Sequence, residues 1–182
     1  LPTTPTAEIT RATFNCNSLL LCGRPTSTTD ANGNVTRKID ANGHSTWYVY
    51  DADNRLTHTI DALGGVSLTV YDAEDRITET RRFATALGAD TIALLDVRQV
   101  VTTADFSLAF TAADRLTQFV YDRDGRQRFT LEAIDASAAV LTERTFDAMG
   151  RVTRERIYST TIPIASYTTT DQVVTAIGRQ GA

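Results

Sequence analysis

Short stretches in which hydrophobic and polar side chains alternate occupy much of the chain. The clearest are residues 35–39 (VTRKI), 45–50 (STWYVY), 56–60 (LTHTI) and 66–71 (VSLTVY). Alternation with a period of two over five or six residues is typical of a strand with one buried face. Because these stretches follow one another with no helical pattern between them, they predict an antiparallel meander in which successive hairpins share one sheet.

A four-residue theme that starts with aspartate separates the stretches. Its seven copies run from Asp30 to Gly33, Asp40 to Gly43, Asp51 to Asn54, Asp61 to Gly64, Asp72 to Asp75, Asp122 to Gly125 and Asp147 to Gly150. Gly, Asn and Asp tolerate a positive φ, and an aspartate carboxylate can accept the backbone N–H two residues further on. The theme therefore predicts a hairpin turn of type I closed by a bulge, with a positive φ at the fourth place.

A longer repeat of 75 residues overlies the short one. Residues 72–83 (DAEDRITETRRF) and 147–158 (DAMGRVTRERIY) share nearly one pattern, and 147 − 72 = 75. Each is followed by a segment in which apolar residues are spaced as in a helix. We expect short helices near residues 91–101 and 170–177, lying on one side of the sheet, with Gly178 ending the second.

Four of the turns share a wider pattern, with an aromatic residue before the aspartate and an arginine after the fourth place. They read YDADNRLT from Tyr50, YDAEDRIT from Tyr71, YDRDGR from Tyr121 and FDAMGRVT from Phe146. This pattern resembles the RHS or YD-repeat family, with one interruption between the second and third copies. The resemblance implies a mainly β fold whose hairpins form a twisted or spiralling sheet. In that family such a sheet builds a hollow shell around a toxin domain, or a barrel in cell-surface adhesion proteins.

The repeats divide the chain into five parts. These are a non-repeat N-terminal segment (1–25), YD repeats (26–83), a helix-containing insertion (84–110), further YD repeats (111–158) and the start of a second such insertion (159–182). Since the second unit breaks off, we expect a fragment of a longer repeat protein or a subunit whose neighbour supplies the next strands. Alone, the chain should not be a monodisperse monomer, and residues 140–158 and 173–177 should be buried against further β-structure. If another copy of the chain covers this C-terminal surface, its apolar residues 14–21 are expected to do so.

Two kinds of side chain recur at fixed places beside the turns. The aromatic residues before the aspartates are predicted to stack on one another as a ladder, although such a stripe can also bind a sugar or a base. The arginines after the turns are predicted to pair with turn aspartates of the neighbouring hairpin, which would set register more than stability. These arginines are Arg55, Arg76, Arg115, Arg126 and Arg151.

Composition narrows the classes of function. The net charge is −4, the pI is about 5.1 and Lys38 is the single lysine, which argues against a broad nucleic-acid surface. No apolar run approaches the length of a membrane span. The 31 threonines suit a pleated, half-exposed surface.

Candidate chemistry is sparse. Cys16 and Cys22 can form a local disulfide or be two free core residues, and neither alternative is favoured. The aspartates at 51 and 122 resemble the start of a calcium loop, but its twelfth place holds alanine in both, so we interpret them as turn residues. His44 should face solvent and His58 the edge of the core. No nucleotide-binding or nucleophile motif is present, so we expect no cofactor, no metal and no catalysis.

The sequence therefore indicates an architectural function. The first hypothesis is a repeat segment of a secreted or surface protein, which the resemblance suggests is bacterial. Its partners would be further repeats of the same longer chain, with any enclosed toxin domain elsewhere, because the family's Asp-Pro-x-Gly processing motif is missing here. The alternative is a self-assembling subunit of an extracellular filament, with copies of itself as partners. A carbohydrate-binding module is the third hypothesis.

Overall fold

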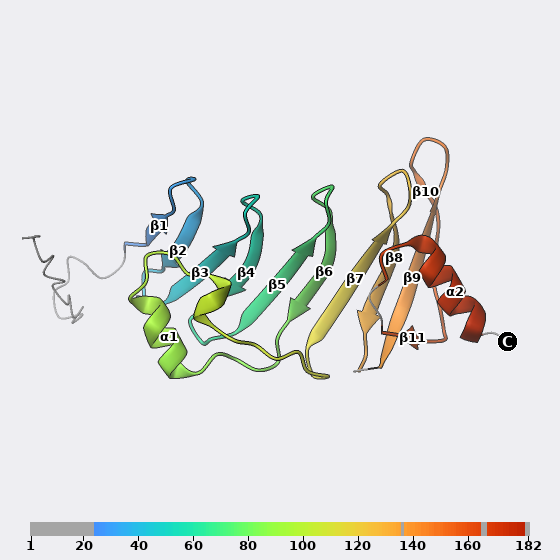
Figure 1. Ribbon diagram of the computed structural model, residues 1–182. Helices are drawn as coiled ribbons and strands as arrows, with labels where there is room; N and C mark the ends of the chain where they lie inside the picture. Colours follow the sequence, from blue (N-terminus) through green and yellow to red (C-terminus); the bar gives the residue numbers. More distant parts are fainter. Residues whose placement is uncertain (1–23, 136, 165–166, 181–182) are drawn as a thin grey trace, which may run out of the picture.

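The protein is one antiparallel sheet with helices on one face (Figure 1). The computed structural model describes residues 24–135, 137–164 and 167–180. Ten strands pair in chain order, and an eleventh pairs with the ninth. They are β1 (Thr26–Thr29), β2 (Val35–Ile39), β3 (Ser45–Tyr50), β4 (Leu56–Ile60), β5 (Val66–Tyr71), β6 (Ile77–Arg82), β7 (Arg115–Tyr121), β8 (Gln127–Ala133), β9 (Ala138–Phe146), β10 (Val152–Ile157) and β11 (Ile162–Pro163). The predicted meander is confirmed, but the described sheet is open and uncurled rather than spiralling.

The helices are α1 (Ala89–Asp96) and α2 (Thr170–Gln180), with a short 3-10 turn, η1 (Thr103–Asp105), after the first. The first helix begins and ends earlier than predicted, and at its last residue the Arg37 guanidinium donates to both the carbonyl and the carboxylate of Asp96. The prediction that Gly178 ends the second helix was wrong. The helix runs on to Gln180, so this glycine lies within the helical backbone.

The apolar side chains of the strands collect on one face of the sheet in two clusters. In the first, Trp47, Ile60 and Val66 lie opposite one another on three strands and pack with Leu95 of α1. In the second, Phe129, Leu131 and Leu141 pack with Val173 of α2. Cross-strand pairs connect the two regions, with Leu68 opposite Arg81 and Arg81 opposite Leu116. Both helices therefore cover the same face, as the sequence predicted.

The other face of the sheet carries threonines in register. Thr69, Thr80 and Thr117 lie opposite one another on three neighbouring strands and are half-buried. β-branched hydroxyl side chains suit such a surface because they fit the pleat without burying an unpaired polar group. These threonines give the sheet a half-buried polar face across β5, β6 and β7.

Candidate functional site

Five of the seven turns, among them the four aromatic-Asp turns, lie side by side along one edge of the sheet, where the strands end. Turns 30–33, 51–54, 72–75, 122–125 and 147–150 join each odd-numbered strand to the next even-numbered one, from β1–β2 to β9–β10, and lie along the upper edge in Figure 1. Turns 40–43 and 61–64 lie on the opposite edge. A meander brings alternate turns together in this way, so residues about twenty apart in sequence become neighbours.

Each turn is held by its aspartate. The Asp51 Oδ1 accepts the backbone N–H of Asp53 at 3.0 Å and that of Arg55 at 2.9 Å, while the Asn54 N–H donates to the Asp51 carbonyl at 3.2 Å. The fourth residue has a positive φ in all seven turns, from 62° at Asn54 and Asp75 to 87° at Gly33. This is the backbone predicted from the choice of residues at that place. The strand register shifts beside the aromatic-Asp turns, as a bulge requires.

The arginine that follows each aromatic-Asp turn binds the aspartate of its own turn. The Arg55 Nε donates to the Asp51 Oδ2 at 2.8 Å, and the matching distance is 2.7 Å for Arg76 with Asp72. The backbone N–H of Arg55, followed by its guanidinium, holds the pKa of the Asp51 carboxyl below its usual range, although partial burial opposes this. The aspartate is therefore ionised at neutral pH and acts as a fixed acceptor.

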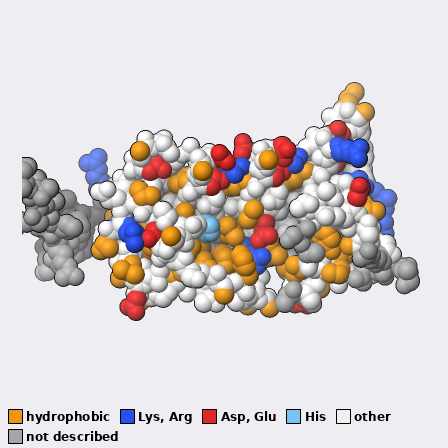
Figure 2. Space-filling view, viewed as in Figure 1, with side chains coloured by type: hydrophobic (Ala, Val, Ile, Leu, Met, Phe, Trp, Pro, Cys, Tyr) orange, Lys and Arg blue, Asp and Glu red, His pale blue; other side chains and the backbone are white. Residues whose placement is uncertain are grey.

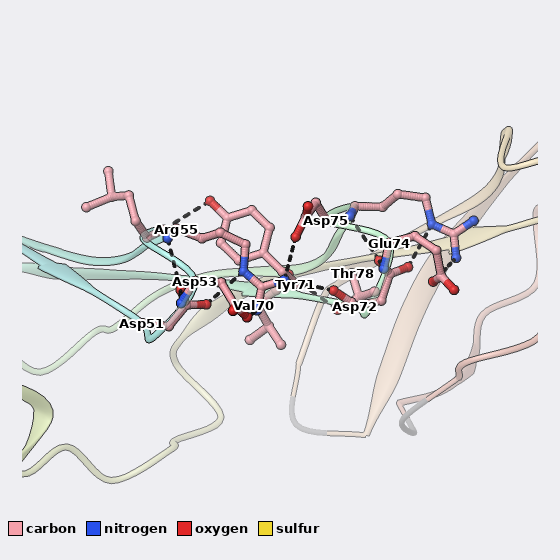
Figure 3. A network of polar contacts seen from close by, with 11 residues as sticks. Asp51, Asp53, Arg55, Val70, Tyr71, Asp72, Glu74, Asp75 and Thr78 are labelled. Atoms are coloured by element: carbon pink, nitrogen blue, oxygen red, sulfur yellow. Dashed lines mark hydrogen bonds and ion pairs between the residues drawn. The ribbon is translucent and has the colours of Figure 1, made fainter. Parts of the chain in front are cut away.

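The same arginine reaches across to the next turn. The Arg55 guanidinium lies 5.1 Å from the centre of the Tyr71 ring and donates to the Asp72 carbonyl at 3.0 Å and the Asp75 Oδ1 at 2.8 Å (Figure 3). In return, the Tyr71 hydroxyl donates to the Leu56 carbonyl at 3.0 Å. We call this reciprocal contact between neighbouring turns the tip clasp.

The tip clasp recurs along the edge. Arg76 lies 4.6 Å from the Tyr121 ring, whose hydroxyl donates to the Ile77 carbonyl at 2.7 Å. These partners are far apart in sequence because the insertion with α1 separates them, yet β6 and β7 are paired in the sheet. The helical insertion therefore leaves the edge uninterrupted.

The remaining positions along the edge depart from the full clasp. Arg126 lies 5.0 Å from the Phe146 ring, which has no hydroxyl to donate. At the first turn Asn34 replaces arginine and donates to the Asn54 Oδ1 at 2.8 Å, while the Tyr50 hydroxyl still donates to the Val35 carbonyl. The edge thus has a short polar contact at its β1 end and arginine-aromatic contacts further on.

Sequence reasoning identified the right side chains but the wrong partners for the rings. The aromatic residues do not stack on one another; the arginine of the preceding hairpin covers Tyr71, Tyr121 and Phe146. The arginines pair mainly with the aspartate of their own turn, and Arg55 also pairs with Asp75 of the next. The constant spacing between aromatic, aspartate and arginine was the available signal. Arg115 stands apart from this set, since it lies opposite Arg82 at the start of β7.

The other predicted chemistry is accounted for separately. His44 is exposed beside Asp40, and His58 packs edge-on against Phe106 at 5.6 Å. Cys16 and Cys22 lie outside the described residues, so their disulfide remains a prediction. Over the described ranges, no group of three His, Cys, Asp or Glu side chains is arranged to hold a metal ion. None of the described helices is long and apolar enough to cross a membrane.

The fold and the row of turns define a class of protein, in which repeated hairpins form one sheet and the turns of neighbouring hairpins contact one another. Within this class, residues 30–66 and 50–86 each match the family model of the RHS Repeat. Residues 30–86 are therefore similar to RHS repeats, in agreement with the resemblance seen in the sequence. No curated protein matches the sequence. A crystal structure of TcdB2-TccC3-TEV is similar over 82% of this chain and 9% of its own, with 10% identity and a TM-score of 0.37. The chain thus spans a small part of that structure's length.

Proposed function

We propose that this chain is a structural repeat segment of a secreted or surface RHS protein, in which its sheet forms part of the wall of a shell or adhesion scaffold. The observation that carries the proposal is the tip clasp, which joins hairpins far apart in sequence into one edge. The Tyr, Asp and Arg side chains of the turns are engaged in these contacts, which favours an architectural role over a ligand platform. The similarity of residues 30–86 to RHS repeats supports a longer parent protein.

The proposal assigns partners and a location. Further repeats of the parent chain would continue the wall, and a toxin domain elsewhere in a bacterial parent protein would be its cargo. An antibody against the purified chain, applied to intact producing cells and to their medium, tests the location, with a cytoplasmic enzyme as control. Signal outside intact cells is expected. Signal only after lysis would contradict a secreted or surface role.

Cryo-electron microscopy of the natural gene product that contains these residues tests the wall. The described sheet should form part of a continuous β-structure with further strands beside it. A separate globular domain with solvent on both outermost strands would contradict the scaffold.

The filament remains a second candidate because both outermost strands are exposed along their described length. All four residues of β1 and all six of β10 are exposed. Edge strands with free backbone groups can pair with another chain. A filament requires β10 of one copy to accept β1 of the next. Carbohydrate binding finds less support, because arginines cover the rings of Tyr71 and Tyr121.

A further inference from the structure

Strand β10 is an outermost strand of the sheet, and its free side is rich in arginine. It pairs with β9 alone among the described residues, and its side chains from Val152 to Ile157 are all exposed. Arg151, Arg154 and Arg156 gather positive charge along it, and Figure 2 shows blue side chains at the end of the sheet where β10 lies. Val152 and Ile157 are exposed by 54% and 67%. Such an edge suits an added strand with aromatic and acidic side chains.

Arg151 is a tip-clasp arginine whose neighbour is missing from the described residues. Its Nε donates to the Asp147 Oδ2 at 2.7 Å, as in the other turns. Its side chain is 75% exposed, against 23% for Arg55 and 32% for Arg76, which each lie against a tyrosine ring. No ring among the described side chains lies against Arg151. By the pattern of the other clasps, it should take an aromatic ring and the carbonyl of the aspartate that follows that ring.

The register of the added strand follows from β6, which holds the same place in its hairpin as β10. Each begins five residues after a turn aspartate. The backbone N–H of the residue after each strand also donates to a carbonyl of the preceding strand, Phe83 to Val66 of β5 at 3.0 Å and Tyr158 to Leu141 of β9 at 2.9 Å. Since β6 pairs with β7, the strand on β10 should resemble β7, the strand before Asp122.

This equivalence sets individual contacts. Gln118, four residues before Asp122, lies opposite Glu79, so the matching residue of the partner should lie opposite Arg154. Asp114, eight residues before Asp122, pairs with Arg81 at 3.4 Å, and Arg156 occupies the place of Arg81. The partner should therefore carry an acid eight residues before its turn aspartate and an aromatic residue one before.

The β1 strand of a second copy does not meet this requirement. The residue before its turn aspartate is Thr29, which offers no ring to Arg151. The three Tyr-Asp hairpins of a second copy are paired on both sides within its own sheet. We propose that β10 is the docking edge for another aromatic-Asp hairpin, bound in the register of β7 on β6 with its aromatic ring on Arg151. This deepens the scaffold proposal and rests on it.

A synthetic peptide that copies residues 111–133 is a probe with the required acid, aromatic residue and turn. Its binding to the full 182-residue chain is measured by fluorescence anisotropy of a label on the peptide. Arg151→Ala in the chain, or Tyr121→Ala in the peptide, should weaken binding about fivefold, through loss of the cation–π contact and its hydrogen bonds. Arg123→Ala, which removes the same charge from a neighbouring turn, is the matched control and should bind as the parent chain does.

Register is tested by disulfide formation in a Cys16→Ser, Cys22→Ser background. Arg154→Cys in the chain should link to Gln118→Cys in the peptide, because residues directly opposite in a sheet bring their Cβ atoms within reach. Glu155→Cys should not, since its side chain points to the other face.

Three results would overturn the proposal: no binding of the peptide, binding that is unchanged by Arg151→Ala, or equal binding of a peptide that copies residues 24–39. The last would make β1 of a second copy the occupant. The location and imaging experiments on the natural gene product are independent of this edge, so the scaffold can stand when this proposal fails.

Discussion

The β5–β6 and β9–β10 hairpins have nearly the same sequence around their turns but different surroundings. In both, the arginine Nε lies 2.7 Å from the Oδ2 of its turn aspartate. Arg76 then lies against Tyr121 of the next hairpin, whereas the Arg151 side chain is 75% exposed. The turn is therefore a local structure, whereas the contribution of its arginine to stability depends on the neighbouring hairpin. Substitutions at equivalent places can test this separation.

The largest effect is expected at glycines that share a backbone but differ in neighbours. A Cβ on Gly64 would lie 2.5 Å from the Leu87 carbonyl oxygen, while a Cβ on Gly150 meets nothing within 4 Å. Gly150→Val should cost about 1–2 kcal/mol from its positive φ alone. Gly64→Val should cost about 3 kcal/mol, because overpacking adds to the same term. Urea unfolding of both variants measures the gap, and equal losses would mean that neighbours do not matter at the turns.

The arginines give the next largest contrast. Arg76→Ala removes a cation–π contact and its bonds to Asp72 and Glu74, and should lower the free energy of unfolding by about 1 kcal/mol. Arg151→Ala should change it by less than about 0.5 kcal/mol, since that side chain is exposed. Thermal unfolding of the two variants is the measurement. A larger loss at Arg151 than at Arg76 would refute the open-edge description.

The hydroxyl of the tip clasp can be removed at one hairpin and added at another. Tyr121→Phe deletes the bond to the Ile77 carbonyl and should cost about 1 kcal/mol. Phe146→Tyr restores the residue found in the other clasps and should stabilise by about 0.5 kcal/mol through a bond to the Gln127 carbonyl. Chemical denaturation compares them. Destabilisation by Phe146→Tyr would show that the two clasps differ in backbone geometry.

The smallest expected effect is a pH dependence of stability that involves the first apolar cluster and not the second. Burial lowers the pKa of His58, which packs against Phe106 beside the first cluster, and the second cluster contains no histidine. Since the His58 pKa is lower in the folded protein, the unfolded state binds a proton more readily. The stability that the neutral, buried His58 contributes is therefore complete above about pH 6.5. It is lost as the pH falls from there through the lower folded pKa. Fluorescence of Trp47, the single tryptophan, should report a lower unfolding midpoint near pH 5.5 than at pH 7.5.

His58→Phe should remove this drop, whereas His44→Gln, at an exposed position, should keep it. The backbone N–H of Arg55 lowers the pKa of the Asp51 carboxyl, so turn aspartates of this kind stay ionised across this pH range. A drop that persists in His58→Phe would assign the pH dependence to another group.

Strands and turns were predictable because their signals are short. Alternation assigns residues to two faces, and a positive φ requires Gly, Asn or Asp, as at Asn54 and Asp75. The ends of the helices were less predictable, since α1 ends where Arg37, from a strand distant in sequence, donates a hydrogen bond to the Asp96 carbonyl. The partner of each aromatic ring was also missed, because the pairing of β6 with β7 across an insertion brings Arg76 to Tyr121.

The sequence by itself determined the hairpins, their turns and the polarity of each strand face, since these depend on interactions within a few residues. Tertiary structure decided which turns share an edge, which rings the arginines cover and which strand is left open. These depend on strand order and on neighbours that are distant along the chain. Arg76 and Arg151 occupy the same place in the repeat, and only the strand beside them makes one a half-buried contact and the other an exposed charge.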